Sequence, residues 1–233
     1  PGGGAGLAWL TYDNDGNARW LVGIGSVEGN RILFPSLQVT SGGIFGPDFD
    51  PDAIVRTSAA NVELFFTGCD SGWFSFAAFG ETGRYTLRRT SRTMAIDCNP
   101  PEDAIILEQA GQSGSWHDPA LDGSGLNLQW FVDGRLGLLW FTYDPQGRQV
   151  YIFGTGTLDG EEVVFNQLFI TRGARFGANF DPNDVERVPW GSARLNINCS
   201  TGRFDYNSSL TDYGSGQLNL ERLTILQGLS CTP

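Results

Sequence analysis

The strongest constraint on the fold of this chain is a long internal repeat. The segment GLAWLTYDNDGNARWLVGIG starts at Gly6, and the related segment GLLWFTYDPQGRQVYIFGTG starts 131 residues later at Gly137. The same offset aligns Phe49-Asp50-Pro51 with Phe180-Asp181-Pro182. A repeat of this length is a whole domain and not the rung of a solenoid, so we expect two related domains.

The repeat also sets the domain boundaries. We expect a first β-domain over residues 1–98, a linker over residues 99–113 and a second, more complete β-domain over residues 114–233. Two prolines at the start of the linker disfavour strand pairing there. Each copy approaches 100 residues, which is enough to bury a hydrophobic core of its own.

The four cysteines predict one disulfide bond in each copy. Four cysteines allow three pairings, and the repeat selects the two that stay within a copy, Cys69–Cys98 and Cys199–Cys231. Closing loops of this length stabilises a domain by about 3–4 kcal/mol. Because disulfides persist in oxidising compartments, we expect a periplasmic, cell-surface or extracellular protein.

Composition argues against several classes of partner. The formal net charge is −11, and the 15 Lys and Arg residues form no cluster that would bind a nucleic-acid backbone. No apolar run approaches the length of a membrane span. The cysteines do not have metal-ligand spacing. We therefore expect no nucleic acid, no membrane span, no metal and no cofactor.

Short apolar and alternating segments between turn signals predict an all-β fold. In the second copy, Leu126–Trp130 alternates with period two, and Asp133-Gly134 is a hairpin turn. Residues 173–189 are expected to form a long loop with one helical turn near 182–185. Sequential hairpins favour a small antiparallel up-and-down barrel in each copy. The other predicted strands of this copy are 136–143, 150–155, 163–171, 193–198, 203–207 and 217–223, with 225–231 as a candidate eighth strand.

An arginine ends the last predicted strand of each copy, Arg89 in the first and Arg222 in the second. A buried guanidinium needs a partner, and Trp116 is the candidate, with the arginine stacked on its indole ring. Gly114, Trp116 and Arg222 together resemble the pattern of the calycin superfamily, the lipocalins and avidins. There a Gly-X-Trp opens the first strand, and an arginine of the last strand packs across it. The resemblance implies calycin-like barrels, with structural roles for Trp116, Arg222 and Arg89.

The chain also resembles tandem Trp/Gly-rich domains of secreted bacterial proteins. Those domains open with Trp-X-Asp-Pro and carry a Phe-Asp-Pro loop, and here Trp116–Pro119 and Phe180–Pro182 match the two motifs. The resemblance implies a secreted bacterial protein and carries no activity with it.

The first copy lacks the opening segment of the second. Nothing before Gly6 corresponds to residues 114–131, so we expect the first barrel to be one strand short, with two edges of unpaired backbone groups. Three explanations are open. The strand has been lost from this chain, residues 103–108 of the linker replace it, or another protein chain supplies it by strand addition.

Candidate catalytic and metal-binding residues have simpler structural interpretations. His117 is the single histidine, which argues against a Ser-His-Asp triad and a zinc site. Asp13–Asn17 begins like a calcium loop but lacks the closing acidic residue, so a hairpin turn is favoured. Glu161-Glu162 with Asp181 and Asp184 would suit glycoside hydrolysis, but of these only Asp181 has a counterpart in the first copy. We therefore expect no catalytic residue.

Aromatic residues shared by the two copies are the best candidates for a ligand or partner surface. Period two places Trp140 and Tyr143 on opposite faces of one strand, so one ring faces the barrel interior and the other faces outward. Exposed rings stack on sugars or meet partner proteins, although a core role is favoured for most of them. The candidate residues are Trp9, Tyr12, Trp20, Trp140, Tyr143 and Tyr151.

These observations favour a non-enzymatic binding or structural module of an extracellular assembly. In this hypothesis, other protein chains dock on the strand edges of the incomplete first domain. The alternative is a pair of barrels that each hold a small apolar or carbohydrate ligand at the mouth. A carboxylate-based glycoside hydrolase comes third. A filled barrel interior would favour the first hypothesis, and an apolar cavity of several hundred Å3 would favour the second.

Overall fold

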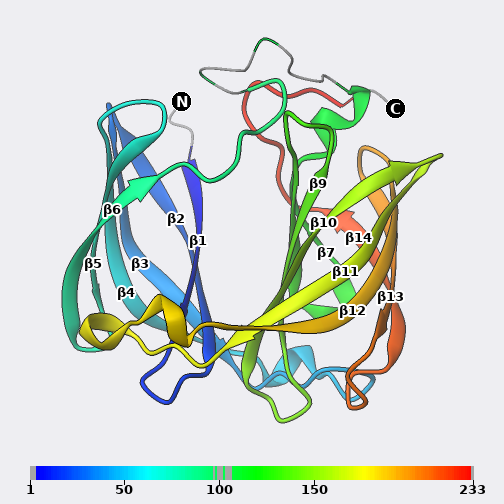
Figure 1. Cartoon of the computed structure of the whole chain (residues 1–233), viewed down its shortest axis with the longest axis horizontal. Coiled ribbons are helices and arrows are strands. Elements are labelled where there is room, and N and C mark those ends of the chain that lie inside the picture. The colour runs from blue at the N-terminus through cyan, green and yellow to red at the C-terminus, as the bar shows by residue number, and fades with distance from the viewer. Residues whose placement is uncertain (1–3, 97, 99–101, 103–106, 232–233) are drawn as a thin grey trace.

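The computed structural model describes residues 4–96, 98, 102 and 107–231 of the chain. Its strands form two antiparallel sheets that stand side by side, one open and one closed (Figure 1). Every helix in this described part is a short 3-10 turn, and none is long and apolar enough to cross a membrane. The predicted all-β class is therefore confirmed.

The second copy closes into an eight-stranded barrel. Strand order around the barrel follows the chain, and β14 meets β7 where Arg222 pairs with Trp116. The predicted up-and-down barrel is thus confirmed for this copy. Its strands are β7 (Gly114–His117), β8 (Gly125–Trp130), β9 (Leu136–Tyr143), β10 (Gln149–Asp159), β11 (Glu162–Arg172), β12 (Glu186–Ile197), β13 (Thr201–Ser208) and β14 (Ser215–Arg222).

The candidate eighth strand at 225–231 is wrong. The eighth strand is β7, and residues 225–231 form turns and irregular backbone. The place beside β14 is already taken by β7, so no free edge remains there for another strand. Leu223 and Thr224 instead hydrogen-bond to Ser115, where the chain leaves the barrel.

The first copy forms an open, curled six-stranded sheet, which we call the half-barrel. The prediction of a barrel one strand short is wrong, because this copy has two strands fewer than the other. The missing counterpart of residues 114–131 is a hairpin, in which β7 and β8 flank the 3-10 turn η3 (Pro119–Leu121). The strands of the half-barrel are β1 (Gly4–Tyr12), β2 (Ala18–Glu28), β3 (Arg31–Ser41), β4 (Val55–Phe66), β5 (Ser71–Ala78) and β6 (Glu81–Arg88).

Among the described residues, no strand pairs with the outer edge of β1 or of β6. The linker explanation concerned residues 103–108. Residues 103–106 lie outside the described part, and Leu107 leads into the 3-10 turn η2 (Glu108–Gln112) without forming a strand. The half-barrel therefore leaves the backbone groups of two strand edges without a strand partner.

Large side chains fill the interior of the closed barrel. Four tryptophans lie inside it with phenylalanine, leucine and tyrosine side chains packed around them. Met94, from the segment after β6, is fully buried at one end, and its N–H donates to the Trp130 carbonyl at 2.8 Å. The fully buried tryptophans and phenylalanines of this core include Trp116, Trp130, Trp190, Phe165 and Phe204.

The two copies exchange loops. Residues 42–54, which follow β3, cross to the closed barrel, and residues 173–185, which follow β11, cross to the half-barrel (Figure 1). Phe45 packs among Trp140, Trp190 and Tyr213 of the barrel core, with ring centroids 4.8–6.2 Å apart. The interior of the closed barrel is therefore completed by a side chain from the first copy.

The reciprocal contact fills the half-barrel. Phe176, from the second copy, is only 2% exposed. Its ring centroid lies 5.7 Å from that of Trp9, 5.6 Å from that of Phe76 and 5.1 Å from that of Phe79. Two separate cores result, joined by two exchanged rings.

The two predicted disulfides are confirmed as Cys69–Cys98 and Cys199–Cys231. Cys98, after β6, is bonded to Cys69 in the β4–β5 turn, and Cys231, after β14, is bonded to Cys199 in the β12–β13 turn. The expected helical turn is also present as η5 (Pro182–Asp184), where the Asp181 carboxylate accepts a hydrogen bond from the Asn183 N–H.

The loop exchange predicts that a residue of the second copy stabilises the first. Phe176→Ala should lower the free energy of unfolding by about 3–5 kcal/mol, because it removes a buried ring and leaves a cavity in the half-barrel. Phe180→Ala is the matched control, since Phe180 is 47% exposed on the same loop. Urea unfolding followed by tryptophan fluorescence measures both. Equal, small effects of the two substitutions would contradict the exchange.

Candidate functional site

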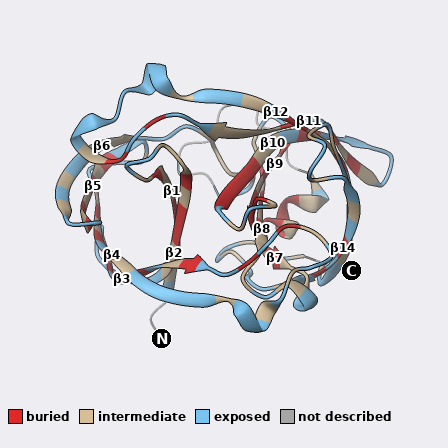
Figure 2. Cartoon of the chain, turned by 90° about the horizontal axis from the view of Figure 1, so that it is seen from below, coloured by how far each residue is buried: buried red, intermediate tan, exposed pale blue. Residues whose placement is uncertain are grey.

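Polar groups and rings bind the two halves together at their centre. Strand β2 packs against β10, and buried segments of β1 and of β9–β10 lie in the middle of the molecule (Figure 2). The Trp20 indole N–H donates to the Thr142 carbonyl at 3.3 Å. The Gln149 side-chain amide donates to the Trp20 carbonyl and to Thr40 Oγ1, both at 3.2 Å. Because these groups are buried, each contact replaces water that folding removed.

The contacts between the halves follow an approximate two-fold symmetry. The Tyr143 hydroxyl donates to Thr40 Oγ1 at 2.6 Å. At the related position, the Tyr151 hydroxyl donates to the Tyr12 hydroxyl at 3.3 Å and accepts from Thr171 Oγ1 at 2.5 Å. Tyr12 with Tyr143 and Thr40 with Thr171 are pairs related by the 131-residue offset. The direct Tyr143–Thr40 contact in one place thus corresponds to a Tyr12–Thr171 pair that the Tyr151 hydroxyl bridges in the other, so the repeat of contacts is partial.

All six candidate aromatic residues lie in the interior or between the halves. None is more than 9% exposed. Trp9 and Trp140 belong to the two cores. Tyr12, Trp20, Tyr143 and Tyr151 lie where the halves meet. Trp9 and Trp140 therefore have a core role, whereas the other four rings join the repeats. Of the six, only Tyr151 also borders the cleft described below.

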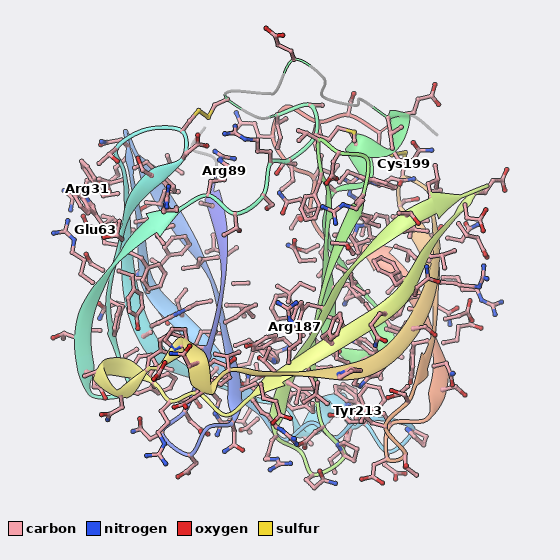
Figure 3. The ribbon with its side chains drawn as sticks, in the orientation of Figure 1. Arg31, Glu63, Arg89, Arg187, Cys199 and Tyr213 are labelled. Carbon is pink, nitrogen blue, oxygen red and sulfur yellow. A yellow bond between two sulfur atoms is a disulfide. The ribbon has the colours of Figure 1, made fainter. Side chains whose placement is uncertain are left out.

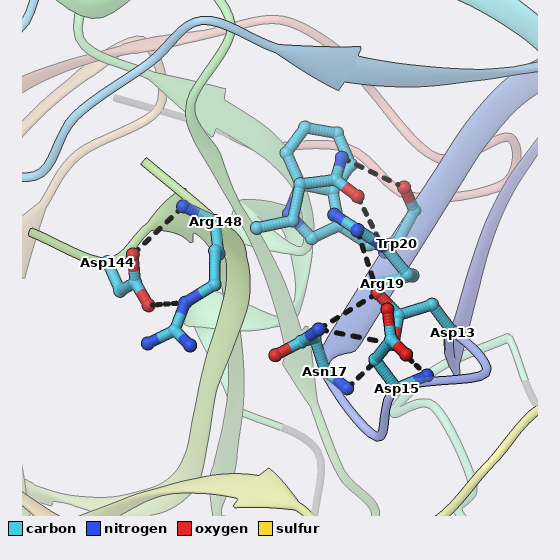
Figure 4. A network of polar contacts seen from close by, with 8 residues as sticks. Asp13, Asp15, Asn17, Arg19, Trp20, Asp144 and Arg148 are labelled. Atoms are coloured by element: carbon cyan, nitrogen blue, oxygen red, sulfur yellow. Dashed lines mark hydrogen bonds and ion pairs between the residues drawn. The ribbon is translucent and has the colours of Figure 1, made fainter. Parts of the chain in front are cut away.

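The acidic turns are hairpin turns (Figure 4). Asp13 accepts hydrogen bonds from the N–H groups of Asp15 and Asn17, and Arg19 lies 2.7 Å away. Burial alone raises the pKa of Asp13, but these hydrogen bonds and the Arg19 charge bring it below its ordinary value. The carboxylate therefore already has its partners within the turn.

The same arrangement recurs at Asp144, which accepts from the N–H groups of Gln146 and Arg148 and pairs with the Arg148 side chain at 2.7 Å. In the described part of the chain, no group of three or more His, Cys, Asp or Glu residues is placed to hold a metal ion. The predicted hairpin turn at Asp13–Asn17 is thus confirmed, and Asp144 occupies the equivalent turn of the second copy.

The remaining candidates lie apart from one another. His117 ends β7 and pairs with Glu221 of β14. Glu162 forms an ion pair with Arg194 at 3.0 Å. Asp181 instead caps a 3-10 turn. These contacts do not assemble a pair of carboxylates around a common space.

The two strand-end arginines perform related tasks. The Arg222 guanidinium lies 5.6 Å from the Trp116 ring centroid, and Nη1 donates to the Cys199 carbonyl at 3.3 Å. In the first copy, Arg89 donates to the Cys69 carbonyl at 2.6 Å through Nη2. Each arginine therefore holds the disulfide-bearing hairpin of its own copy, and Arg222 also covers a tryptophan.

A cleft of about 860 Å3 lies between the halves. Its floor is the outer face of β8–β11, and Leu10 of β1 forms part of the opposite wall. Arg187 of β12 reaches into this region (Figure 3). Its guanidinium carbon lies 5.6 Å from the Phe153 ring centroid and 5.5 Å from that of Phe169. The lining combines aromatic rings with hydrogen-bonding side chains, among them Asn127, Gln129, Tyr151, Asn166, Gln167 and Thr171.

The sequence interpretation missed this cleft. Its floor comes from alternate residues of β10 and β11, such as Phe153, Thr155 and Phe169. The period-two pattern of these strands was the available signal. The pattern shows which residues share a face, but it does not show that the other repeat stands opposite that face.

Comparison with protein-family models, with curated proteins and with solved structures finds no significant match to this chain.

Buried tyrosines predict a loss of stability in alkali. Burial raises the pKa of Tyr143, Tyr151, Tyr206 and Tyr213 above the ordinary value. The unfolded chain therefore loses tyrosine protons at lower pH than the folded chain does. The stabilising effect is complete below about pH 10 and is lost as pH rises above it.

Tyr151→Phe should make this alkaline decline shallower, because one of these titrating groups is removed. Denaturant unfolding at a series of pH values measures the effect. Below about pH 9 the variant and the parent should give parallel profiles, which serves as the internal control. An unchanged slope above pH 10 would show that the Tyr151 hydroxyl is accessible to solvent.

Proposed function

We propose that the chain is a non-enzymatic binding module of an extracellular, cell-surface or periplasmic assembly. It binds polypeptide along the open side of the half-barrel, between the edges of β1 and β6. The observation that carries the proposal is the contrast between the two copies. One is a closed barrel with a filled interior, and the other has the same repeat pattern but an open sheet.

The filled interior argues against ligand binding at the barrel mouths. Phe45 and Tyr213 pack together at one mouth, with ring centroids 4.8 Å apart, and the buried Met94 packs in the same core from the other side. The described cleft lies outside the barrel. A binding function therefore has to use an outer surface or a strand edge.

Strand edges supply backbone donors and acceptors to a partner strand. Such an edge binds extended polypeptide through main-chain hydrogen bonds, with pockets for alternate side chains giving specificity. The half-barrel has two such edges and an interior that is only partly covered near them, at Ala5, Leu7 and Leu87. Two disulfides suit a module that works in an oxidising compartment.

Selection from a random peptide library against the intact chain tests this proposal. Selected peptides should alternate apolar and polar residues with period two, and binding should slow hydrogen exchange of the β1 and β6 amides. Hydrogen exchange read by mass spectrometry locates the contact. Peptides that protect only other regions, or a library that yields no binder, would refute the proposal.

A second candidate function is carbohydrate binding in the cleft. The observation that favours it is a lining of aromatic rings, amides and Arg187 around about 860 Å3, a volume typical of ligand sites. Aromatic faces and amide groups together suit a sugar ring.

Isothermal titration with a panel of oligosaccharides tests the carbohydrate candidate. Phe169→Ala should abolish any binding observed, whereas Phe180→Ala, on an exposed loop away from the cleft lining, should leave it unchanged. Binding that survives Phe169→Ala would place the sugar elsewhere, and no heat with any sugar would rule out this candidate.

A further inference from the structure

We infer that the open side of the half-barrel is a receptor site for a β-hairpin of the Gly-X-Trp type that residues 114–131 form in the closed barrel. This inference rests on the proposed function and names its partner. The occupant is a polypeptide segment other than residues 1–233, with a tryptophan in its first strand, an Asp-Gly turn and an alternating apolar second strand.

The closed barrel shows which element belongs in the gap. Its hairpin stands between β14 and β9, with β7 paired to β14 and β8 paired to β9. By sequence, β9 corresponds to β1, and the strand ending at Arg222 corresponds to the one before Arg89. The two edges left open in the half-barrel are therefore the two that the hairpin joins in the closed barrel.

The interior side chains next to the gap are less buried than their counterparts. In the closed barrel, Leu136 and Leu138 of β9 are at most 3% exposed. At the same positions of β1, Ala5 and Leu7 are only half buried. This part of the half-barrel interior is therefore an apolar surface that no neighbouring strand of the described residues buries.

The pattern repeats on the last strand. Leu218 and Leu220 of β14 are at most 4% exposed, whereas their counterpart Tyr85 on β6 is 39% exposed and Leu87 is half buried. Uncovered rows thus line both sides of the gap. A hairpin placed between them would bury both at once.

The residue that follows β6, Arg89, is the arginine that the hairpin would need. Arg222 binds the Cys199 carbonyl and covers Trp116, the tryptophan of β7. Arg89 binds the Cys69 carbonyl in the equivalent way. A tryptophan in the first strand of the added hairpin would therefore lie against the Arg89 guanidinium.

In the closed barrel, the turn between β7 and β8 contacts the half-barrel. There Asp122 pairs with Arg56 of the half-barrel at 2.8 Å. The neighbouring Gly123 lies so close to Ile54 that an added Cβ would meet its side chain at 2.8 Å. The hairpin of one copy therefore reaches across to the other copy.

The counterpart of the Arg56–Asp122 ion pair is missing at the related position of the closed barrel, among the described residues. The offset of 131 residues carries Arg56 to Arg187 and Ile54 to Val185. Within the described residues, no ion pair is recorded for Arg187, which lies over the rings of Phe153 and Phe169 in the cleft (Figure 3). An aspartate in the turn of the added hairpin would pair with Arg187, as Asp122 pairs with Arg56.

The probe is a synthetic peptide with the sequence of residues 114–131, added to the intact protein. We expect saturable binding that protects the amides of β1 and β6 from hydrogen exchange. The same peptide with Trp116→Ala should bind more than about thirtyfold more weakly, because the tryptophan would be the buried anchor.

A double-mutant cycle locates the turn. Arg187→Ala in the protein should weaken binding of the unmodified peptide by about two- to fivefold, as expected for an exposed ion pair. The same substitution should have no effect on a peptide carrying Asp122→Ala. Arg194→Ala is the matched control, since Arg194 forms an exposed ion pair elsewhere on the barrel.

A fused variant keeps the test decisive if the free peptide aggregates. The same hairpin sequence is placed directly before Pro1, which raises its effective concentration. This fusion should unfold at higher denaturant concentration than the parent, and the fusion carrying Trp116→Ala in the added segment should lose most of the gain.

The outcomes separate this inference from the proposed function. If library peptides protect β1 and β6 but neither the hairpin peptide nor the fusion does, the inference fails and the proposed function stands. If nothing protects these edges, both fail. If the protein alone forms dimers that the peptide disperses, the occupant is the hairpin of a second copy and the inference is wrong.

Discussion

Each half of this molecule depends on a phenylalanine from the other half. Phe45 leaves the first repeat to pack among Trp140 and Trp190, and Phe176 leaves the second to pack against Trp9. Because the two loops cross in opposite directions, neither core is complete without the other repeat. The exchange fixes how the repeats sit, and it buries the polar groups around Gln149 that join them.

The two repeats differ in closure: the second is a complete barrel, and the first is an open sheet. The second repeat is closed, and large buried side chains fill its interior. The first repeat is held to that barrel by the exchange, although its own sheet stays open. A half-closed sheet that is supported from outside can keep strand edges available. That combination, together with the cleft beside Arg187, is the physical basis for the binding function that we propose.

Much of the fold was predictable from local signals. Period two and turn residues predicted the strands, the repeat selected the Cys69–Cys98 and Cys199–Cys231 pairs, and the Asp181 cap marked a helical turn. The loop exchange was not predictable, because Phe45 and Phe176 keep the same offset whichever core they enter. Strand β7 has only four residues, too few to show the period-two pattern of a strand. The segment missing from the first copy therefore looked like one strand, although it is a hairpin of two.

The site was less predictable for a related reason. Trp20 and Tyr151 stand on outward faces, as a ligand surface would require, but those faces meet each other. A sequence shows which side chains share a face of a sheet and does not show what covers that face. The cleft and Arg187 follow only from the way in which the two repeats are placed.

Residue-resolved hydrogen exchange of the free protein tests the central claim most directly, that the first repeat is the second without its opening hairpin. We predict that the backbone N–H groups of β1 and β6 that point to the open edges of the sheet exchange far faster than the N–H groups at the aligned positions of β9 and β14. In the closed barrel those edges are paired, β9 with β8 and β14 with β7. Equal protection of the two sets would mean that the first sheet is closed, and it would contradict the account.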